Sequence, residues 1–219
     1  MQKRTIIFGS YNTAEHGWTL GQWTLTDAEQ KTNYVDKPGG DGSWDLSTAL
    51  TDGIPRYKNR TLTVPLECSK GTREDRLRLV SEMVNELDGL EWQIVLPDHP
   101  DHYLVGRLRV VVDYCDLAHA KVTVTGTVEP WLYSARESVV EVVGTGAEAD
   151  IYIHNKGRKA VVPMLTVEGD FRIRLGNASV QLEEGAYKWP TLLLLPGLTQ
   201  LSYVGTGALT LTFREAVLR

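Results

Sequence analysis

Residues 36–89 read DKPGGDGSWDLSTALTDGIPRYKNRTLTVPLECSKGTREDRLRLVSEMVNELDG and join a glycine-rich loop, an alternating strand and a helix. The loop carries Pro38 followed by Gly39, Gly40, Asp41 and Gly42. Because glycine permits positive φ and proline fixes φ, this run disfavours both helix and ladder.

Residues 60–67 alternate apolar and polar side chains, which predicts a strand with one face in a core. Pro65 lies in that strand and has no N–H to donate to a ladder. It therefore predicts a sheet edge or a β-bulge at this position.

The helix has a start, a stop and an apolar stripe. Thr72 is placed as the N-cap, with Asp75 three residues later as in a capping box, and Gly89 follows the last turn. Positions with a 3.6-residue period form the stripe: Leu77, Val80, Met83, Val84 and Leu87. The rest of the chain has strand patterns, so we expect this helix to pack on a sheet.

The composition excludes several classes of protein. A net charge of −5 without a basic cluster argues against nucleic-acid binding. The longest apolar run, residues 192–195, is far too short for membrane insertion, and residues 1–10 lack a secretion signal. Cys68 and Cys115 give neither a disulfide framework nor metal-ligand spacing. We expect a soluble protein made in a cytoplasm.

The second part of the chain has short alternating segments separated by glycine and asparagine turns. Predicted turns include residues 168–170 and 205–207, and a predicted strand covers residues 191–195. This spacing is typical of a β-sandwich or barrel. We predict two domains, residues 1–132 and 133–219, in a mainly β chain with one α-helix.

Motifs for catalysis are weak. Residues 98–102 (DHPDH) could hold a metal ion, yet they lie between two strand patterns and contain ordinary turn formers, which favours a turn. Residues 144–149 echo a dinucleotide loop but precede a strand pattern instead of the required helix. Without a phosphate loop or a nucleophile elbow, we expect no enzyme, metal or cofactor.

Three aromatic residues allow two interpretations. Trp131, Tyr187 and Trp189 could form an exposed platform for sugar rings, because a flat aromatic ring offers sugars an apolar face. Alternatively, they fill the core of the domain, which is the commoner role of tryptophan.

Several short motifs, taken in order, carry a resemblance to a known family. They are Pro38-Gly-Gly-Asp41-Gly42-Ser-Trp44-Asp-Leu-Ser47, Tyr57-Lys-Asn-Arg60, Tyr103-Leu-Val-Gly106-Arg107-Leu108, Ile153-His-Asn155-Lys-Gly157, Ala160-Val-Val-Pro163 and Leu165-Thr-Val167-Glu-Gly169. Together they resemble the distal tail proteins of long, non-contractile-tailed bacteriophages and related prophages. The resemblance covers nearly the whole chain, and the order of the motifs carries it.

The resemblance implies a structural protein of the virion. It implies a homohexameric ring at the tail tip, assembled in the host bacterial cytoplasm, that joins the tail tube to the baseplate. The implied partners are the tail tube protein, the tape-measure protein, a tail-tip hub protein and a receptor-binding protein. The first domain would build the ring, and the second would be a galectin-like or carbohydrate-module-like sandwich that holds receptor-binding proteins.

A ring of identical subunits needs surfaces that meet a neighbour in only one geometry. The sequence offers a loop, a strand and a hairpin tip as candidate contacts: Pro38, Gly39, Gly40, Asp41, Gly42, Trp44, Pro65, His99 and His102. Trp44 either anchors such an interface or fills its own core. Two alternatives to the tail-tip ring stay open: a carbohydrate-binding module or lectin, and another β-rich tail tube component.

Overall fold

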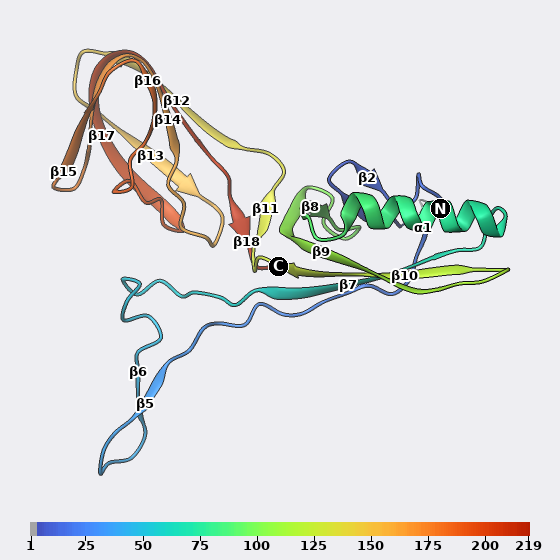
Figure 1. The fold of residues 1–219 in the computed structure, drawn as a ribbon. Coiled ribbons are helices and arrows are strands. Elements are labelled where there is room, and N and C mark those ends of the chain that lie inside the picture. The colour runs from blue at the N-terminus through green and yellow to red at the C-terminus, as the bar shows by residue number, and fades with distance from the viewer. Residues whose placement is uncertain (1–3) are drawn as a thin grey trace. The chain divides into compact units, whose positions relative to one another are not determined.

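A computed structural model describes residues 4–219 (Figure 1). The chain divides into two compact units, Met1–Pro130 and Trp131–Arg219. Strands dominate both units, and α1 (Arg73–Leu87) is the one helix among the described residues. The predicted mainly β chain with one helix is confirmed. That helix is too short and too polar to cross a bilayer.

Unit 1 is built on one antiparallel sheet with the strand order β2-β1-β8-β9-β10-β7-β3, and β4 also pairs with β7. Its strands are β1 (Ile7–Phe8), β2 (Tyr11–Asn12), β3 (Thr19–Leu20), β4 (Thr24–Leu25), β7 (Arg60–Cys68), β8 (Glu91–Val95), β9 (His102–Cys115) and β10 (Ala120–Val128). A separate ribbon pairs β5 (Tyr34–Asp36) with β6 (Ser43–Asp45).

Helix α1 packs against β9 and β10, as the sequence predicts. The predicted alternation of β7 is confirmed, with Leu62, Val64 and Leu66 fully buried. The helix contributes Val80 and Met83 to the same core. The opposite face of the sheet, which points away from α1, is called the outer face below.

The capping box of α1 is confirmed in both directions. The Asp75 N–H donates to the Thr72 hydroxyl at 3.2 Å, and the Thr72 N–H donates to the Asp75 carboxylate at 2.9 Å. These bonds satisfy orphan donors of the first turn. After the helix, Gly89 has φ +73°, a left-handed conformation suited to a residue without Cβ.

Pro65 predicted a sheet edge or a β-bulge. The edge is wrong, because β10 lies on one side of β7 and β3 and β4 lie on the other. The register along β7 shifts by one residue between β3 and β4, opposite Pro65, which agrees with the bulge alternative. Pro65 explains why two short strands, β3 and β4, instead of one continuous strand, pair with β7 on the side away from β10. Its missing N–H interrupts the ladder between β3 and β4, while its carbonyl still accepts the Gly21 N–H at 2.9 Å.

Unit 2 is organised around two long strands, β14 (Met164–Leu175) and β17 (Gly197–Phe213), which pair with each other. Four shorter strands flank them: β12 (Ser138–Thr145) and β13 (Ala149–Asn155) on β17, and β15 (Ala178–Leu182) and β16 (Gly185–Lys188) on β14. A small pair, β11 (Leu132–Ser134) and β18 (Ala216–Val217), completes the unit.

Two predicted turns of unit 2 are wrong: residues 168–170 lie inside β14 and residues 205–207 lie inside β17. The glycines mark bends in the long strands instead. Gly169 pairs with Gly207, with φ values of +106° and +102°. A Cβ on Gly207 would lie 1.9 Å from the Glu168 carbonyl oxygen, so the backbones approach too closely for a side chain.

The bend lets one sheet enclose one core. Side chains from both halves of the long strands, including Leu165, Ile173, Leu201 and Leu211, belong to the same buried cluster. The sheet therefore acts as both layers of a sandwich-like unit. The predicted strand at residues 191–195 is wrong, since only an isolated bridge joins Leu194 to residue 161 while the side chain of Leu194 fills the core.

Candidate assembly interface

Residues 27–59, called the arm below, connect β4 to β7 without a core of their own. No residue from 21 to 59 is buried. The β5–β6 ribbon inside the arm forms a separate two-stranded sheet (Figure 1). An isolated two-stranded ribbon is at best marginally stable in water, so this segment needs a surface to pack against.

The root of the arm is fixed to the sheet. Arg60 is buried, and its side-chain Nε donates to the Thr26 carbonyl at 2.6 Å. The Thr26 N–H donates in turn to the Thr61 carbonyl at 3.0 Å. Farther out, Lys58 pairs with Glu29 at 2.7 Å, an exposed ion pair of the kind that contributes about 0–1 kcal/mol. Backbone hydrogen bonds also join the two limbs there, from the Lys58 N–H to the Glu29 carbonyl and from the Lys31 N–H to the Arg56 carbonyl, both at 2.8 Å. The arm is therefore anchored at its base, and its two limbs are joined to each other without a buried side chain.

The predicted glycine-rich loop is the turn at the tip of the arm. Gly39 and Gly42 have φ values of +70° and +76°, and the Lys37 N–H donates to the Gly42 carbonyl at 3.2 Å. All five predicted contact residues of this turn, from 38 to 42, are exposed. The ribbon that precedes and follows the turn pairs Val35 with Trp44.

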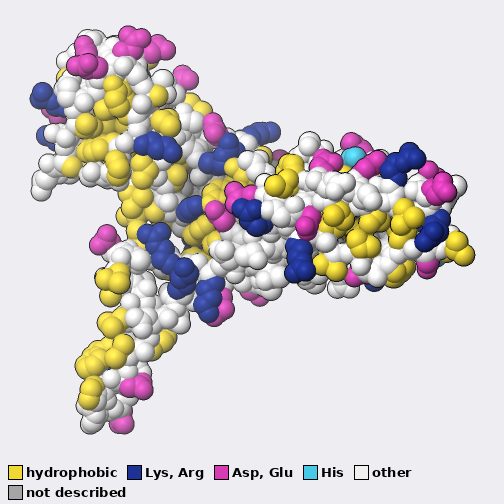
Figure 2. Space-filling view, in the orientation of Figure 1, with side chains coloured by type: hydrophobic (Ala, Val, Ile, Leu, Met, Phe, Trp, Pro, Cys, Tyr) yellow, Lys and Arg dark blue, Asp and Glu magenta, His cyan; other side chains and the backbone are white. Residues whose placement is uncertain are grey.

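The arm exposes large apolar side chains along its length, which Figure 2 shows as a hydrophobic stretch. The exposed fractions are 61% for Tyr34, 43% for Val35, 51% for Trp44, 42% for Leu46 and 99% for Leu50. Trp44 therefore does not fill a core of its own chain. An exposed apolar patch of this kind marks an interaction surface.

The arm is also acidic around its apolar side chains. Asp36, Asp41 and Asp45 flank the tip, against the single cation Lys37 between residues 33 and 50. Hydrogen bonds from the Ser47 hydroxyl and backbone N–H lower the pKa of Asp45. Asp45 therefore carries its charge at neutral pH, and a partner surface of the arm should be positive at its rim.

The remaining predicted contacts lie elsewhere in unit 1. His99 lies in the turn between β8 and β9, and His102 is the first residue of β9, with ring centroids 6.5 Å apart and the His102 N–H donating to the His99 carbonyl. The predicted turn is confirmed. Within residues 4–219, no three His, Cys, Asp or Glu side chains come together as a metal site would require. Pro65 lies half-buried on the outer face.

The three aromatic residues considered as a sugar platform are half-buried. Tyr187 and Trp189 pack against the core of unit 2. Trp131 opens the same unit just before β11. Rings held in this way offer less flat apolar surface than a sugar platform needs. The placement of Tyr187 and Trp189 favours the core interpretation.

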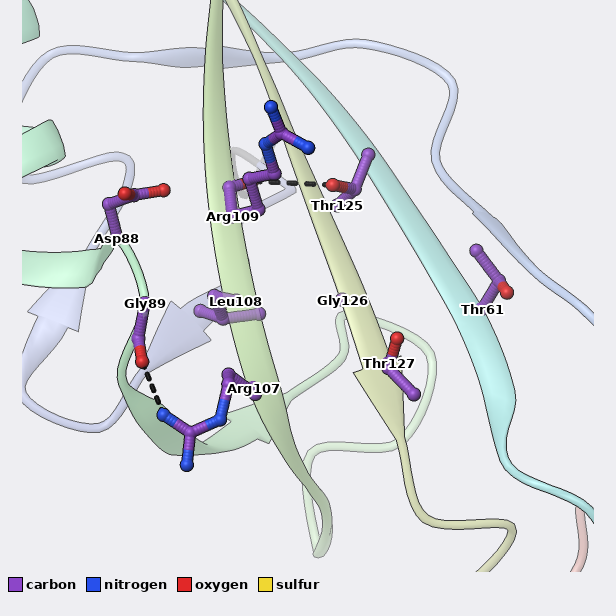
Figure 3. A pocket seen from close by; sticks show the side chains of 9 residues that line it. All are labelled: Thr61, Asp88, Gly89, Arg107, Leu108, Arg109, Thr125, Gly126 and Thr127. Carbon is purple, nitrogen blue, oxygen red and sulfur yellow. Dashed lines mark hydrogen bonds between the residues drawn. The ribbon is translucent and has the colours of Figure 1, made fainter.

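An open groove of about 510 Å³ lies beside the end of α1 (Figure 3). Its lining residues are Thr61, Asp88, Gly89, Arg107, Leu108, Arg109, Thr125, Gly126 and Thr127. Arg107 turns toward the helix end and donates to the Gly89 carbonyl, and Asp88 accepts the Val110 N–H at 2.8 Å. The groove thus presents hydroxyls and guanidinium groups. The charged side chains of Arg107 and Asp88 already form hydrogen bonds with backbone groups. This arrangement joins helix to sheet and contains no nucleophile paired with a base.

Sequence reasoning missed a second exposed apolar surface, at the turn between β9 and β10. The exposed fractions are 40% for Val111, 46% for Val112, 45% for Tyr114 and 86% for Leu117. One signal was available in the sequence. Three consecutive valines, residues 110–112, cannot all face one side of a strand, so at least one must face away from the core.

Comparisons with known proteins support the fold. No family model matches the chain, and a search of curated proteins gives no match. The chain is similar to a solved structure, the crystal structure of the SPP1 Dit (gp 19.1) protein, described as a paradigm of the hub adsorption apparatus in phages that infect Gram-positive bacteria. The TM-score is 0.71 at 15% identity, over 97% of this chain and 98% of that one. At this identity the likeness establishes a shared fold.

Proposed function

We propose that this protein is a structural component of the tail tip of a long, non-contractile-tailed phage or prophage, in which six copies form a ring. The observation that carries the proposal is the fold shared with the SPP1 hub protein over nearly the full length of both chains. Both units take part in that match, so the likeness is not confined to one common β-architecture.

The arm supports the assembly part of the proposal. A closed ring is built by heterologous contacts, in which one surface of a subunit meets a different surface of the next. Residues 27–59 have apolar side chains and no core, and such a segment becomes stable when a second subunit covers it. Trp44 is the proposed anchor of this contact.

The proposed role is structural rather than enzymatic. The ring would join the tail tube protein to the baseplate, with the tape-measure protein and a tail-tip hub protein as further neighbours. Unit 2 would provide the attachment platform for receptor-binding proteins. In this role the work of the protein is to hold defined surfaces in a fixed symmetry.

Two measurements test the proposal. Light scattering and negative-stain microscopy of the purified protein should give a mass six times that of the 24.4 kDa chain and rings with a central channel. Antibodies raised against the protein should label the tail tips of particles produced from the genome that encodes it. Labelling of the capsid or of the tail shaft would contradict a place at the tip, and absence of the protein from purified particles would contradict a virion role.

A further inference from the structure

The turn between β9 and β10 displays a fixed apolar surface. We call this surface the hairpin end and define it as Val111, Tyr114 and Leu117, because Val112 pairs with the buried Val122 and faces the helix side of the sheet. Figure 2 shows hydrophobic side chains at this outer end of unit 1. Leu117 is 86% exposed, which is unusual for a leucine that its surroundings hold in place.

Several hydrogen bonds make the hairpin end rigid. The Asp116 carboxylate accepts the N–H groups of Ala118 at 2.7 Å and His119 at 2.6 Å, and these bonds lower the pKa of Asp116. The buried Arg76 donates to the carbonyls of Asp116 at 3.2 Å and Leu117 at 2.6 Å. A surface that is already ordered loses little conformational entropy on binding.

The outer face of the sheet changes character along its strands. Near the hairpin end the outer face carries an apolar zone of Val111, Tyr114 and Pro65. The ion pair of Lys121 with Glu67 and the hydrogen bond from Thr123 to Asp113 interrupt this zone. Toward the other end the outer face carries the polar side chains Thr61, Arg107, Arg109, Thr125 and Thr127. The apolar zone is therefore local and does not cover the whole face.

The arm and the hairpin end lie at opposite ends of the same strands. The arm joins the sheet at Arg60, which pairs with Val128, whereas the hairpin turn joins it at Ala120, which pairs with Cys68. Nine-residue strands separate the two ends by roughly 27 Å at 3.4 Å per residue. A contact between these two surfaces on different copies is directional, and repeated contacts give a ring or a filament.

We propose that the hairpin end of one copy receives the arm of the next copy. This inference rests on the self-assembly included in the proposed function and deepens it by naming the two surfaces that meet. Trp44 and its neighbours on the β5–β6 ribbon cover Tyr114 and Leu117 and form an apolar centre. Each aromatic side chain buries about 150–250 Å² when fully covered, so Tyr34 and Trp44 supply part of the roughly 800 Å² per partner of a standard interface. The other exposed apolar side chains of the arm, Val35, Leu46 and Leu50, add to this area.

Charged side chains of both signs surround the apolar centre, and Asp113 and Asp116 supply the negative ones. Lys70 and Arg73 are exposed beside the hairpin end, where Arg76 joins the Gly71 carbonyl to the Leu117 carbonyl. The arm brings the aspartates at positions 36, 41 and 45. Attraction of these aspartates to Lys70 and Arg73, together with their repulsion by Asp113 and Asp116, would fix the orientation of the arm on the hairpin end.

A mixing experiment tests this contact. An arm variant, V35S/W44S, keeps an intact hairpin end, and a hairpin variant, Y114S/L117S, keeps an intact arm. By sedimentation velocity each variant alone should be a monomer, because each lacks one of the two surfaces. Mixed in equal amounts, they should form a dimer of one copy of each and nothing larger. The control V139S/V143S, which changes exposed valines of unit 2, should assemble like the unaltered protein.

Three outcomes would overturn the contact: a hairpin variant that assembles like the unaltered protein, two variants that stay monomeric when mixed, or an unaltered protein that is monomeric at every concentration. If either variant loses its circular dichroism signal, a photo-crosslinking residue at position 44 of the otherwise unaltered chain replaces the mixing test. Its crosslinked peptide must then come from residues 111–119, and any other peptide contradicts the proposal.

The contact and the virion role can fail separately. Assembly through the arm and the hairpin end, combined with no antibody labelling of tail tips, would leave the contact standing and remove the proposed function. Labelled tail tips, combined with a hairpin variant that still assembles, would leave the proposed function standing and remove the contact.

Discussion

Trp44 is the single side chain on which assembly should depend most. It is half-exposed on the ribbon and touches no core of its own chain. Trp44→Ala should therefore leave the free energy of unfolding of the monomer within about 0.5 kcal/mol. Loss of an interface anchor costs 2 kcal/mol or more, so we expect self-association at least about 30-fold weaker.

Light scattering over a concentration series measures the effect of Trp44→Ala, and urea unfolding checks the monomer. Val139→Ala is the matched control, because Val139 is 53% exposed and lies in unit 2. Unchanged assembly of the Trp44 variant would remove the anchor role. A large loss of monomer stability would show that Trp44 packs within its own chain.

Arg76 makes the opposite prediction, a loss of stability within one chain. Its guanidinium is buried and donates to the carbonyls of Gly71 at 2.7 Å and Leu117 at 2.6 Å, among others. Arg76→Met would leave these carbonyls without their donor and should cost about 2–4 kcal/mol in the free energy of unfolding.

Chemical denaturation measures the free energy of unfolding of Arg76→Met and of the control Arg78→Met. Because Arg78 is exposed on the same helix, the control shows the effect of an Arg-to-Met change on helix propensity alone. The Arg78 variant should lie within about 0.5 kcal/mol of the unaltered protein. Equal effects of the two substitutions would contradict the bridging role of Arg76.

Tyr11 should make stability depend on alkaline pH. Burial raises the pKa of Tyr11 to about 12, the Trp18 indole N–H acts in the opposite direction, and the charges of Glu86 and Glu82 add a smaller increase. Between pH 10 and about 12 the unfolded chain loses this proton while the folded chain keeps it. The stabilisation is therefore complete below pH 10 and is lost as pH rises, by about 3 kcal/mol in full.

Unfolding measured from pH 8 to about 12 in the unaltered protein and in Tyr11→Phe checks the alkaline loss. The difference between the two proteins should shrink as pH rises, because the phenylalanine variant has no proton to lose. Tyr152→Phe, at a 62% exposed position, should run parallel to the unaltered protein. A constant difference for Tyr11→Phe would contradict the raised pKa.

In α1, the periodic pattern of the sequence predicted most of the buried residues but not all of them. The period placed Leu77 in the apolar stripe, yet Leu77 is 39% exposed and Arg76 is buried instead. The observed stripe of positions 76, 80, 83 and 87 has the same period, shifted by one residue at its start. Hydrophobicity alone could not find this, because Arg76 is buried for its hydrogen bonds to carbonyls of two loops. The capping box was predictable because both partners lie within three residues of each other.

At the scale of elements, unit 2 depends on its glycine bends. Gly207 has φ +102°, and a Cβ there would lie 1.9 Å from a carbonyl oxygen of the neighbouring strand. Gly207→Ala must strain the backbone and separate β14 from β17, so we expect a loss of about 3–5 kcal/mol. Thermal unfolding of the isolated variant measures this loss.

Gly176→Ala is the matched control for the bend. Gly176 also has positive φ, at +57°, but nothing lies within 4 Å of its Cβ position. This variant should lose only about 1–2 kcal/mol, the cost of a left-handed conformation for alanine. If Gly176→Ala were as damaging as Gly207→Ala, close backbone approach would not be the reason for the glycine.

The same bends explain why the sequence predicted turns inside β14 and β17. Local sequence rules interpret Gly169 and Gly207 as turns that end a strand, because a turn and a sharp bend both require positive φ. Only the pairing of these two glycines across the ladder distinguishes a bend from a turn, and pairing is not encoded locally. Strand β7, which contains no glycine, was predicted at residues 60–67 and is observed at Arg60–Cys68.

At the scale of the whole molecule, some features of the arm could be predicted from the sequence and others could not. Its glycine tip was predictable from composition, and so was its lack of helix. Its lack of any buried residue was not, because Tyr34, Trp44 and Leu46 have the composition of a core segment. A single chain contains no local signal that a hydrophobic side chain will be covered by another copy of itself.

This organisation predicts a specific pattern of proteolysis. Trypsin should cut the monomer first within the arm, after Lys31 or Arg56, because neither residue is buried and cleavage requires an extended segment free of packing. The two fragments should remain together on gel filtration, since β4 pairs with β7 and Arg60 holds the Thr26 carbonyl.

Assembly should then protect the arm, because docking on a neighbour removes the local opening that a protease needs. Cleavage followed by mass spectrometry at low and high protein concentration measures this protection, and Trp44→Ala should cancel it. Early cleavage between β14 and β17 would place the weakest segment in unit 2. Equal cleavage of the arm at every concentration, in a protein that light scattering shows to be assembled, would mean that copies associate through surfaces other than the arm.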